Sequence, residues 1–468
     1  MNTTPESNVR SVDVAIIGTG TAGMAAYRAA LKYTSQIVLI EGGPYGTTCA
    51  RVGCMPSKLL IAAADAAHHL EEAHHFGVTS PQKARVDGKK VMARVRAERD
   101  RFVGFVLESV EGFSEAHRVR GYARFLDAHT LQVGDQRIEA RRVVIATGSR
   151  PRVLPFLSDL GDRLLVNDDI FNWDELPSSV AVFGPGVIGL ELGQALHRLG
   201  VRVQVLGVGG FVGPLTDPQV REQARQIFSA EFPLEPNATG CQAVREGSGV
   251  RVSWHDAEGM PHTEHFDYVL AATGRQPNVD KLGLERTGLA LDVRGVPLYD
   301  QKMLQCGKTH IFIAGDANAD LPLLHEAADE GRIAGENAGH FPEVQPGLRR
   351  TPLSVVFSDP NIAMVGETWA QLQGREWVLG AVSFDDQGRS RVMRLNKGRL
   401  HLYADRQTGR LLGAELVGPR AEHLGHLLAW SHQQGLTIAQ MLEMPFYHPV
   451  IEEGLRTALR DADAKLRA

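Results

Sequence analysis

The sequence predicts an α/β protein with two Rossmann-like dinucleotide-binding domains followed by a C-terminal α+β domain. Two glycine-rich turns, each between an apolar run and a helix-forming stretch, predict the two dinucleotide-binding domains. A change to a strand-rich pattern near residue 349 predicts the third domain. A chain of 468 residues has room for about three domains.

The first glycine turn lies in a strand, turn, helix, strand pattern. An apolar run over 12–17 precedes the turn, a helix is expected over 24–32, and a second apolar run over 37–40 ends at Glu41. The three glycines are Gly18, Gly20 and Gly23. In such a motif the first glycine permits the tight turn, the second lets a pyrophosphate approach the backbone, and the third lets helix and strand pack closely. Glu41 stands where an acid accepts hydrogen bonds from ribose hydroxyls.

The same pattern recurs later in the chain, with apolar runs over 180–183 and 201–206 and a helix expected over 190–199. Its glycines are Gly184, Gly186 and Gly189. Gly207 takes the place that Glu41 has in the first copy, so the acid is missing. NAD-binding units usually carry this acid, whereas NADP-binding units recruit arginine. Because no arginine cluster follows the run, we expect NAD, with NADP not excluded.

An apolar run that ends in Ala-Thr-Gly follows each copy, at 146–148 and at 272–274. We therefore divide the chain into a first part of one dinucleotide-binding domain, a second dinucleotide-binding domain, a second part of the first domain, and a C-terminal domain, with bounds 1–152, 153–276, 277–348 and 349–468. In the C-terminal domain we expect strands within 355–365 and 391–417, and a last helix over 452–465.

Composition and charge leave a small molecule or a protein as the expected substrate. The chain is 43% hydrophobic, 22% charged and has a net charge of -5, which gives no electrostatic reason to bind nucleic acid or an anionic membrane. Its apolar runs are shorter than the roughly 20 residues of a membrane helix. Residues 1–11 show no secretory signal pattern, so we expect a cytoplasmic protein.

The four cysteines are too few for a disulfide framework in a chain of this length. Cys49 and Cys54 are five residues apart, about 7.5 Å along the axis of a regular helix, so bridging them requires an irregular segment, which Gly53 permits. A close pair in a reducing compartment is more often catalytic, redox-sensing or metal-binding than structural. No second Cys/His pair lies nearby, which disfavours zinc. Cys241 and Cys306 are expected to be inert thiols.

The segment 46–58, with Cys49 and Cys54, resembles the redox motif of the pyridine nucleotide–disulfide oxidoreductases. The first glycine turn, both Ala-Thr-Gly segments, Gly315-Asp316 and the segment 448–453 also fall where that family has them. Within the family the motifs are most similar to those of the dihydrolipoamide dehydrogenases. The resemblance implies FAD in the first domain, NAD in the second and a C-terminal dimerisation domain.

The resemblance also implies site residues. Cys54 would face the flavin, Cys49 would exchange with substrate, and His448 of a second subunit would move the proton, oriented by Glu453. The implied catalytic residues are Cys49, Cys54, His448, Glu453, Lys58 and Glu191. The implied FAD contacts are Gly18, Gly20, Gly23, Glu41, Gly42, Thr48, Lys58, Thr147, Gly148, Gly315 and Asp316. The implied NAD contacts are Gly184, Gly186, Gly189 and Gly274, and no metal is expected. Each role has a structural alternative. His448 could be satisfied by backbone contacts before Pro449, and Lys58 and Glu191 could form a purely structural ion pair.

The implied reaction is the oxidation of dihydrolipoamide by NAD, in a homodimer that serves the lipoyl domain of a 2-oxo acid dehydrogenase or glycine-cleavage complex. A related enzyme for another small disulfide, such as glutathione, is the main alternative, but it would need NADP and arginines for the substrate carboxylates. A mercuric reductase is disfavoured because 465–468 holds no cysteine pair. A transhydrogenase or a non-catalytic flavoprotein is disfavoured by the intact redox set.

Overall fold

The computed structural model describes residues 9–79 and 85–468. The chain forms two compact units, each built from three segments. The first unit consists of Met1–Pro56, Arg96–Arg152 and Arg275–Arg349, and the second of Ser57–Val95, Val153–Gly274 and Arg350–Ala468. Residues 1–8, where the expected first domain begins and where no signal is expected, lie outside the described residues.

A seven-stranded sheet forms the centre of the first unit, in the order β3-β2-β1-β6-β5-β4, with β17 paired to β6. β1 runs parallel to β2 and β6, and β17 runs parallel to β6. The strands are β1 (Val9–Ile17), β2 (Ile37–Glu41), β3 (Arg118–Arg120), β4 (Ala123–Phe125), β5 (Thr130–Val133), β6 (Gln136–Ile145) and β17 (Ile311–Ile313). Apolar residues fill consecutive positions of β1 and β2 because both faces of the parallel part are buried.

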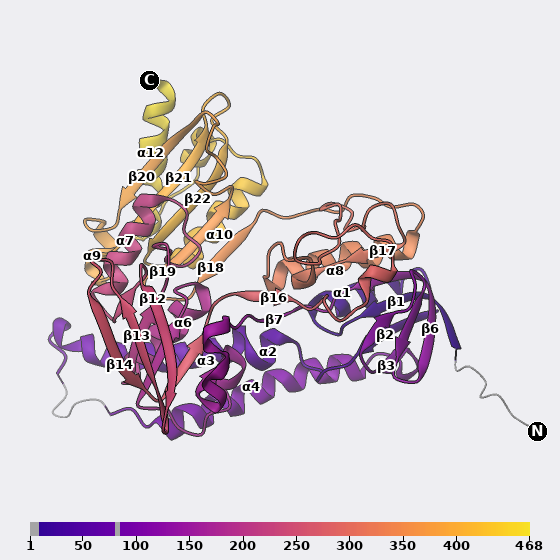
Figure 1. Ribbon diagram of the computed structural model, residues 1–468. Helices are drawn as coiled ribbons and strands as arrows, with labels where there is room; N and C mark the ends of the chain where they lie inside the picture. The colour runs from indigo at the N-terminus through magenta and orange to yellow at the C-terminus, as the bar shows by residue number, and fades with distance from the viewer. Residues whose placement is uncertain (1–8, 80–84) are drawn as a thin grey trace, which may run out of the picture. The chain divides into compact units, whose positions relative to one another are not determined.

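Two helices, α1 (Thr21–Ala30) and α8 (Leu324–His340), pack closely against each other in this unit (Figure 1). A Cβ on Gly331 would lie 2.1 Å from the Ala22 carbonyl oxygen, and one on Gly335 would lie 2.3 Å from that of Ala26. Glycine at both positions therefore permits the close crossing. The unit also contains α2 (Thr48–Val52), η2 (Glu115–His117), β7 (Ser149–Pro151), β16 (Arg275–Pro277), η4 (Leu284–Arg286) and η5 (Gly315–Asn318). Residues of both units belong to α3 (Cys54–Glu72) and α4 (Gly88–Glu111).

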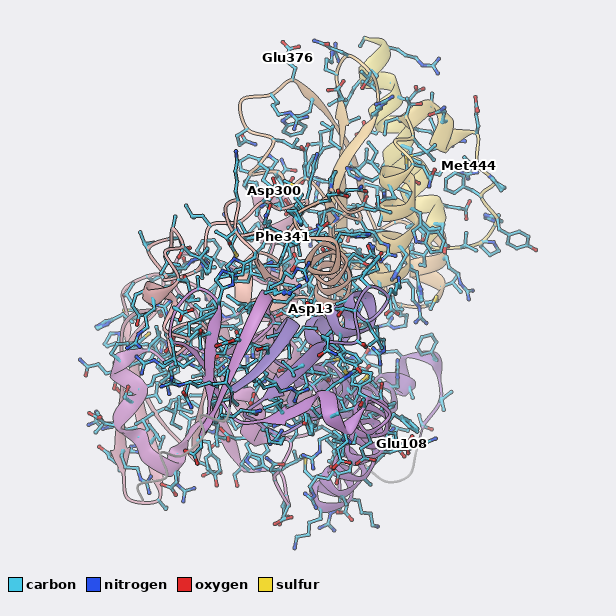
Figure 2. The ribbon with its side chains drawn as sticks, turned by 90° about the vertical axis from the view of Figure 1, so that its right-hand side faces the viewer. Asp13, Glu108, Asp300, Phe341, Glu376 and Met444 are labelled. Carbon is cyan, nitrogen blue, oxygen red and sulfur yellow. The ribbon has the colours of Figure 1, made fainter. Side chains whose placement is uncertain are left out.

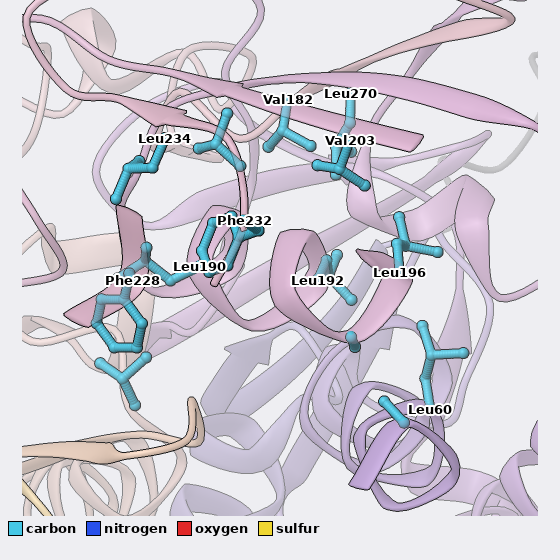
Figure 3. Close-up of a cluster of buried hydrophobic side chains, with 14 of the residues drawn as sticks. Leu60, Val182, Leu190, Leu192, Leu196, Val203, Phe228, Phe232, Leu234 and Leu270 are labelled. Atoms are coloured by element: carbon cyan, nitrogen blue, oxygen red, sulfur yellow. The ribbon is translucent and has the colours of Figure 1, made fainter. Parts of the chain in front are cut away.

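The second unit contains a parallel sheet in the order β11-β10-β9-β15-β8. Its strands are β8 (Leu164–Leu165), β9 (Ser179–Phe183), β10 (Arg202–Leu206), β11 (Leu234–Glu235) and β15 (Tyr268–Ala271). The helices α6 (Val187–Arg198) and α7 (Pro218–Ser229) supply Leu190, Leu196 and Phe228 to one core with the sheet residues Val182 and Val203, as Figure 3 shows. This burial fixes the strand ends from which the second glycine turn extends.

A three-stranded antiparallel sheet that the sequence analysis missed follows β11 in the second unit. It consists of β12 (Thr239–Glu246), β13 (Gly249–His255) and β14 (Pro261–Phe266). Val250, Val252 and Trp254 of β13 alternate with less buried residues. The shorter elements are η1 (Ala73–Phe76), η3 (Pro155–Arg163) and α5 (Asn167–Ile170).

The C-terminal part of the second unit is an antiparallel sheet in the order β18-β19-β22-β21-β20, on which α10 and α12 pack (Figure 1). The elements are β18 (Leu353–Val356), β19 (Asn361–Gly366), β20 (Trp377–Ser383), α9 (Gly388–Val392), β21 (Arg399–Asp405), β22 (Leu411–Gly418), α10 (Ala421–Gln433), α11 (Ile438–Leu442) and α12 (Glu452–Arg467). No helix in the described part of the chain has the length and apolar character that spanning a membrane requires.

Several expected bounds were wrong. Residues 391 and 392 belong to α9 and not to a strand, because the Gln387 side chain accepts a hydrogen bond from the Ser390 N–H and caps a helix there. β20 was missed altogether. The helices α1 and α6 begin at Thr21 and Val187, earlier than expected, because the third glycine of each turn lies inside the helix.

Candidate functional site

The first glycine turn is held by two close contacts and leaves its middle glycine open. Gly18 has a φ of +109°, and a Cβ there would lie 2.3 Å from the Ala146 carbonyl oxygen. A Cβ on Gly23 would lie 1.8 Å from the Gly18 carbonyl oxygen, whereas one on Gly20 would meet nothing within 4 Å. The first and third glycines are therefore needed for packing. The second leaves room for a pyrophosphate at the N-terminus of α1.

Glu41, at the end of β2, lies against this turn. One carboxylate oxygen accepts hydrogen bonds from the Thr19 N–H (2.9 Å) and the Thr19 hydroxyl (2.6 Å), and the other accepts from the Gly43 N–H (2.7 Å). The neighbouring Gly42 packs against an aromatic ring, because a Cβ there would lie 2.3 Å from Tyr122 Cδ1. The acid is thus held at the carboxyl end of the second strand, the place expected for a ribose contact.

Asp316 lies in the short helix η5 and is held by two residues that the sequence analysis missed. The Ser149 hydroxyl donates to Asp316 Oδ2 at 2.7 Å, and Arg275 Nε donates to the Ser149 hydroxyl at 2.7 Å. Ser149 and Arg275 lie on β7 and β16, which pair with each other. Both directly follow the repeated Ala-Thr-Gly segments, which is the signal that could have found them.

A buried carboxyl group stands behind the same turn. Glu330 of α8 accepts hydrogen bonds from the Gly315 N–H and the Asn318 side chain, each at 2.7 Å. Arg349 Nη2 lies 2.9 Å from the other carboxyl oxygen. Burial raises the pKa of Glu330 to about 7, although the Arg349 charge acts in the opposite direction. Glu330 therefore fixes the backbone that carries Asp316.

One unsatisfied polar atom indicates that a ligand completes the first unit. The Thr147 hydroxyl is buried and has no hydrogen-bond partner among the residues that the structure describes. A buried hydroxyl without a partner is costly, so such groups usually meet a ligand or a water molecule. Together with the open side of Gly20 and the left-handed Gly148 (φ +68°), this hydroxyl fits a bound dinucleotide.

The cysteine segment is interrupted between its two sulfurs. Cys49 is half-buried in α2, and Cys54 is exposed as the first residue of α3. Between them Gly53 has φ -127° and ψ -115°, so the helix does not continue. A Cβ on Gly53 would lie 3.0 Å from the Thr48 carbonyl oxygen and 3.3 Å from Cys49 Cα. At a helix N-terminus, the dipole and the unpaired N–H groups favour a thiolate.

The second glycine turn repeats the geometry of the first. Gly184 has a φ of +107°, and a Cβ there would lie 2.4 Å from the Ala272 carbonyl oxygen. A Cβ on Gly189 would lie 1.8 Å from the Gly184 carbonyl oxygen, and one on Gly186 would meet nothing within 4 Å. This turn can therefore hold a second pyrophosphate, and Gly274 (φ +94°) follows the neighbouring strand β15.

Lys58 and Glu191 form a close ion pair in the second unit. Lys58 Nζ lies 2.7 Å from Glu191 Oε2, and the other carboxylate oxygen accepts from the Phe357 N–H at 3.0 Å. The Glu191 side chain is only 5% exposed, so the pair needs both partners to offset desolvation. Lys58 Nζ also lies 4.5 Å from the centre of the Phe357 ring.

His448 and Glu453 are also paired. Nδ1 of His448 lies 3.1 and 3.0 Å from the two Glu453 carboxylate oxygens, which also accept from Val450 and Arg456. The hydrogen bond from His448 contributes most to lowering the pKa of Glu453. The carboxylate therefore favours the tautomer with hydrogen on Nδ1, which leaves Nε2 able to accept a proton.

Cys241, Cys306 and His325 take no part in the contacts described above for the glycine turns, the cysteine segment and the two ion pairs. Burial raises the pKa of Cys306 to about 12 and also raises that of Cys241, so neither thiol ionises readily. His325 is half-exposed at the start of α8, with Nε2 3.9 Å from a Glu326 carboxylate oxygen.

The two glycine turns, the acid of the first turn and the cysteine segment are typical of proteins that bind two dinucleotides and carry a close pair of cysteines. Residues 12–331 match the family model of the pyridine nucleotide-disulphide oxidoreductases, and residues 353–459 match the dimerisation domain of that family. The chain belongs to this family. It is a flavoprotein disulfide oxidoreductase with FAD and NAD as cofactors, as expected from the sequence.

Relatives align along nearly the whole chain. A dihydrolipoyl dehydrogenase of Geobacillus stearothermophilus is 32% identical over 454 residues, which covers 94% of this chain and 93% of that protein. One from Thermus scotoductus is 31% identical and covers 96% and 97%. Among solved structures, LpdA from Mycobacterium tuberculosis is 27% identical with a TM-score of 0.80 and covers 96% and 99%. The flavoprotein disulfide reductase RclA from Escherichia coli, at 23% identity and a TM-score of 0.77, covers 97% of this chain and 99% of that chain and shares the fold. The predicted family and fold class are confirmed.

Proposed function

We propose that the chain oxidises dihydrolipoamide to lipoamide with NAD as acceptor, as a homodimer in the cytoplasm. The observation that carries the proposal is the cysteine segment, in which Gly53 interrupts the helix between Cys49 and a Cys54 at a helix N-terminus. The aligned relatives named dihydrolipoyl dehydrogenase support this substrate. The sequence-derived domain bounds and site residues form part of the same proposal.

The reaction is a dithiol–disulfide exchange. The proposed reaction starts from the oxidised protein, in which a disulfide joins Cys49 and Cys54, whereas both are free cysteines in this structure. A thiolate of dihydrolipoamide attacks Cys49 Sγ, the disulfide breaks, and Cys54 leaves as the thiolate. The second substrate thiolate then displaces Cys49, so that lipoamide leaves as a cyclic disulfide and both cysteines are reduced. The first glycine turn and Glu41 would hold FAD, which would supply the redox chemistry that links this dithiol to NAD. The sum is dihydrolipoamide and NAD⁺ to lipoamide, NADH and one proton.

His448 takes the proton from the substrate thiol and returns it later. Its Nδ1 is held by Glu453, and its side chain is 80% exposed. Exposed apolar residues lie on the same part of the chain, including Tyr447 (80% exposed) and Met444 (50% exposed; Figure 2). These features support a surface that a second copy covers, so that His448 serves the cysteines of its partner. The matched dimerisation domain supports the same assembly.

The proposed partner of the dimer is a lipoyl domain of a 2-oxo acid dehydrogenase or glycine-cleavage complex. Such a domain would carry the dihydrolipoyl group to Cys49. The net charge of -5 gives no reason to expect nucleic acid or an anionic membrane instead.

The experiment that tests the exchange role is Cys49→Ser. The variant should lose dihydrolipoamide oxidation by roughly a thousandfold or more, because an alcohol does not take part in disulfide exchange. FAD should stay bound, as measured by flavin absorbance, while NADH formation measures turnover. The control is Cys306→Ala, which removes a buried thiol and should keep activity. Normal turnover in Cys49→Ser would refute the proposal.

A further inference from the structure

The two glycine turns differ at a pair of positions that touch each other. In the first turn Thr19 donates two hydrogen bonds to Glu41, one from its N–H and one from its hydroxyl. The corresponding residues of the second turn are Pro185 and Gly207. Proline has no N–H, and its ring carries no hydroxyl. Pro185 therefore could not hold an acid at position 207 as Thr19 holds Glu41.

Space also excludes a side chain at position 207. A Cβ there would lie 2.4 Å from Pro185 Cγ, 2.5 Å from Pro185 Cδ and 3.4 Å from Pro236 Cα. The backbone of Gly207 is not in the left-handed region, so space and not conformation requires glycine. Pro185 and Gly207 thus form a matched pair, as Thr19 and Glu41 do, and the loss of the acid is built into the turn.

A hollow of about 950 Å³ lies beside this turn. It is lined by the loop after β10, the loop after β11 and the β12–β14 sheet, and its walls include Phe156, Val208 and Asn237. In a parallel α/β sheet a dinucleotide binds past the carboxyl ends of the strands. Val208 is 68% exposed and Phe156 is 39% exposed. These apolar walls suit the flat purine of an adenosine.

Charge is nearly absent from this hollow. Among the described residues that line it, Asp256 is the only charged one, and no lysine or arginine is present. The Asp256 carboxylate is occupied within its own hairpin turn, where it accepts from the Glu258 N–H (3.1 Å), the Met260 N–H (2.8 Å) and the His262 ring (2.7 Å). A 2′-phosphate therefore finds no cation here, and the 2′-hydroxyl finds no uncommitted carboxylate.

The charged residues on the neighbouring strands are engaged as well. Glu235, at the end of β11, accepts from the Asn237 N–H at 2.8 Å. Arg202, at the start of β10, pairs with Glu264 at 2.5 Å. Neither lines the hollow, whose described lining residues therefore include neither an arginine for a 2′-phosphate nor an acid at position 207 for a 2′-hydroxyl.

We infer that the second unit binds the adenosine half of its nucleotide by shape and apolar contact. NADH and NADPH therefore reduce the bound flavin with similar efficiency. The inference rests on the part of the proposed function that places a nicotinamide dinucleotide in this unit. A hydrogen bond to a charged group changes affinity by roughly tenfold to a hundredfold. Because that contact is absent, the two nucleotides should differ by less than about tenfold in efficiency.

The first experiment is anaerobic reduction of the bound flavin in the FAD-loaded protein by NADH and by NADPH. It needs no disulfide substrate, so a wrong substrate assignment would appear separately, as absent dihydrolipoamide turnover with flavin reduction intact. We expect second-order reduction rates that differ by less than about tenfold. A difference of tenfold or more in either direction, or no reduction by either nucleotide, would overturn the inference.

The second experiment transplants the first turn's pair into the second turn. Gly207→Glu alone should lose nucleotide-dependent reduction, because the new side chain meets the Pro185 ring. Pro185→Thr alone should leave the NADH/NADPH ratio near that of the parent protein. The double variant Pro185→Thr, Gly207→Glu should favour NADH at least about tenfold more than the parent does. A folded, flavin-loaded double variant with the parent ratio would contradict the inference.

A third variant does not depend on repacking the turn. Val208→Arg places a cation on an exposed position of the hollow and should raise the efficiency of NADPH relative to NADH by about fivefold or more. The matched control is Val293→Arg, at a fully exposed position of the first unit, which should leave the ratio unchanged. An unchanged ratio in Val208→Arg would show that the 2′ group does not approach this hollow.

Discussion

The two glycine turns of this protein share their packing contacts and differ at the end of the second strand, where a ribose contact is expected. Cβ atoms on Gly18 and Gly184 would lie 2.3 and 2.4 Å from the carbonyl oxygens of Ala146 and Ala272, which directly follow β6 and β15. At the end of the second strand, however, the first turn has Glu41 bonded to Thr19, and the second has Gly207 against Pro185.

The difference separates two kinds of constraint. The first and third glycines are required wherever a strand, turn and helix must approach this closely, whatever nucleotide is bound. The residue at the end of the second strand contacts the residue after the first glycine, so the two can differ as a pair between turns that keep the same packing glycines. Similar packing in two places therefore does not imply similar selectivity.

The largest expected effect tests the shared part of the comparison. Gly18→Ala and Gly184→Ala should each destabilise the protein by about 2–4 kcal/mol, since each adds a methyl group against a carbonyl oxygen at a positive φ. Gly18→Ala should lose FAD, whereas Gly184→Ala should keep FAD and lose reduction by NADH. Denaturant unfolding and flavin absorbance measure the two effects.

The control for this pair is Gly104→Ala in α4, where a Cβ would meet nothing within 4 Å. It should be neutral or stabilising by up to about 1 kcal/mol, because alanine is the better helix former. If Gly18→Ala retained FAD with normal stability, the close approach in the first turn would not be required.

A smaller expected effect is a pH dependence of stability that arises in the first unit. It comes from the buried Glu330, which accepts a hydrogen bond from the Gly315 N–H. Its folded-state pKa is about 7, above the ordinary 4.5, so the folded state holds the proton more tightly. This contribution is fully present below pH 4.5 and is lost as the pH rises to about 7. Relative to Glu330→Gln, the parent protein should lose up to about 3 kcal/mol across that window.

Unfolding by denaturant at a series of pH values measures this difference. Above pH 7 the two stability curves should run parallel, which serves as the internal control. Parallel curves throughout the window from pH 4.5 to 7 would mean that Glu330 titrates normally in the folded state.

The smallest expected effect concerns Thr147, whose buried hydroxyl has no hydrogen-bond partner in the described part of the chain. Thr147→Val should stabilise the flavin-free protein by about 1 kcal/mol and weaken FAD binding about fivefold, because FAD then loses one hydrogen bond. Titration of the flavin-free protein with FAD measures the affinity. Thr273→Val, at the corresponding place in the second copy, should leave FAD affinity unchanged. Tighter FAD binding by Thr147→Val would show that the hydroxyl does not meet the cofactor.

Local sequence patterns predicted much of the fold. The glycine turns, their flanking strands and the last helix were found from spacing and apolar runs, because strand–turn–helix units impose strict local requirements. The β12–β14 sheet and β20 were missed. Their strands are stabilised by antiparallel partners and by packing, and β20 has a glycine, Gly380, where a Cβ would lie 2.4 Å from a carbonyl oxygen of α12.

The candidate site residues also fall into two groups, those that short motifs predicted and those that only the folded structure revealed. Glu41, Asp316 and the cysteines belong to short motifs, so sequence spacing could find them. Ser149 and Glu330 act through contacts with residues 167 and 15 positions away, respectively, and these contacts depend on how strands and helices pack.

The sequence by itself determined the family, the two glycine turns and the close pair of cysteines, because each depends on residue types at fixed short spacings. It also showed that the second turn lacks an acid. Only the tertiary structure decided why, since the contact between Pro185 and Gly207 joins residues from different strand ends. Such contacts arise when separate segments fold together, and no local pattern records them.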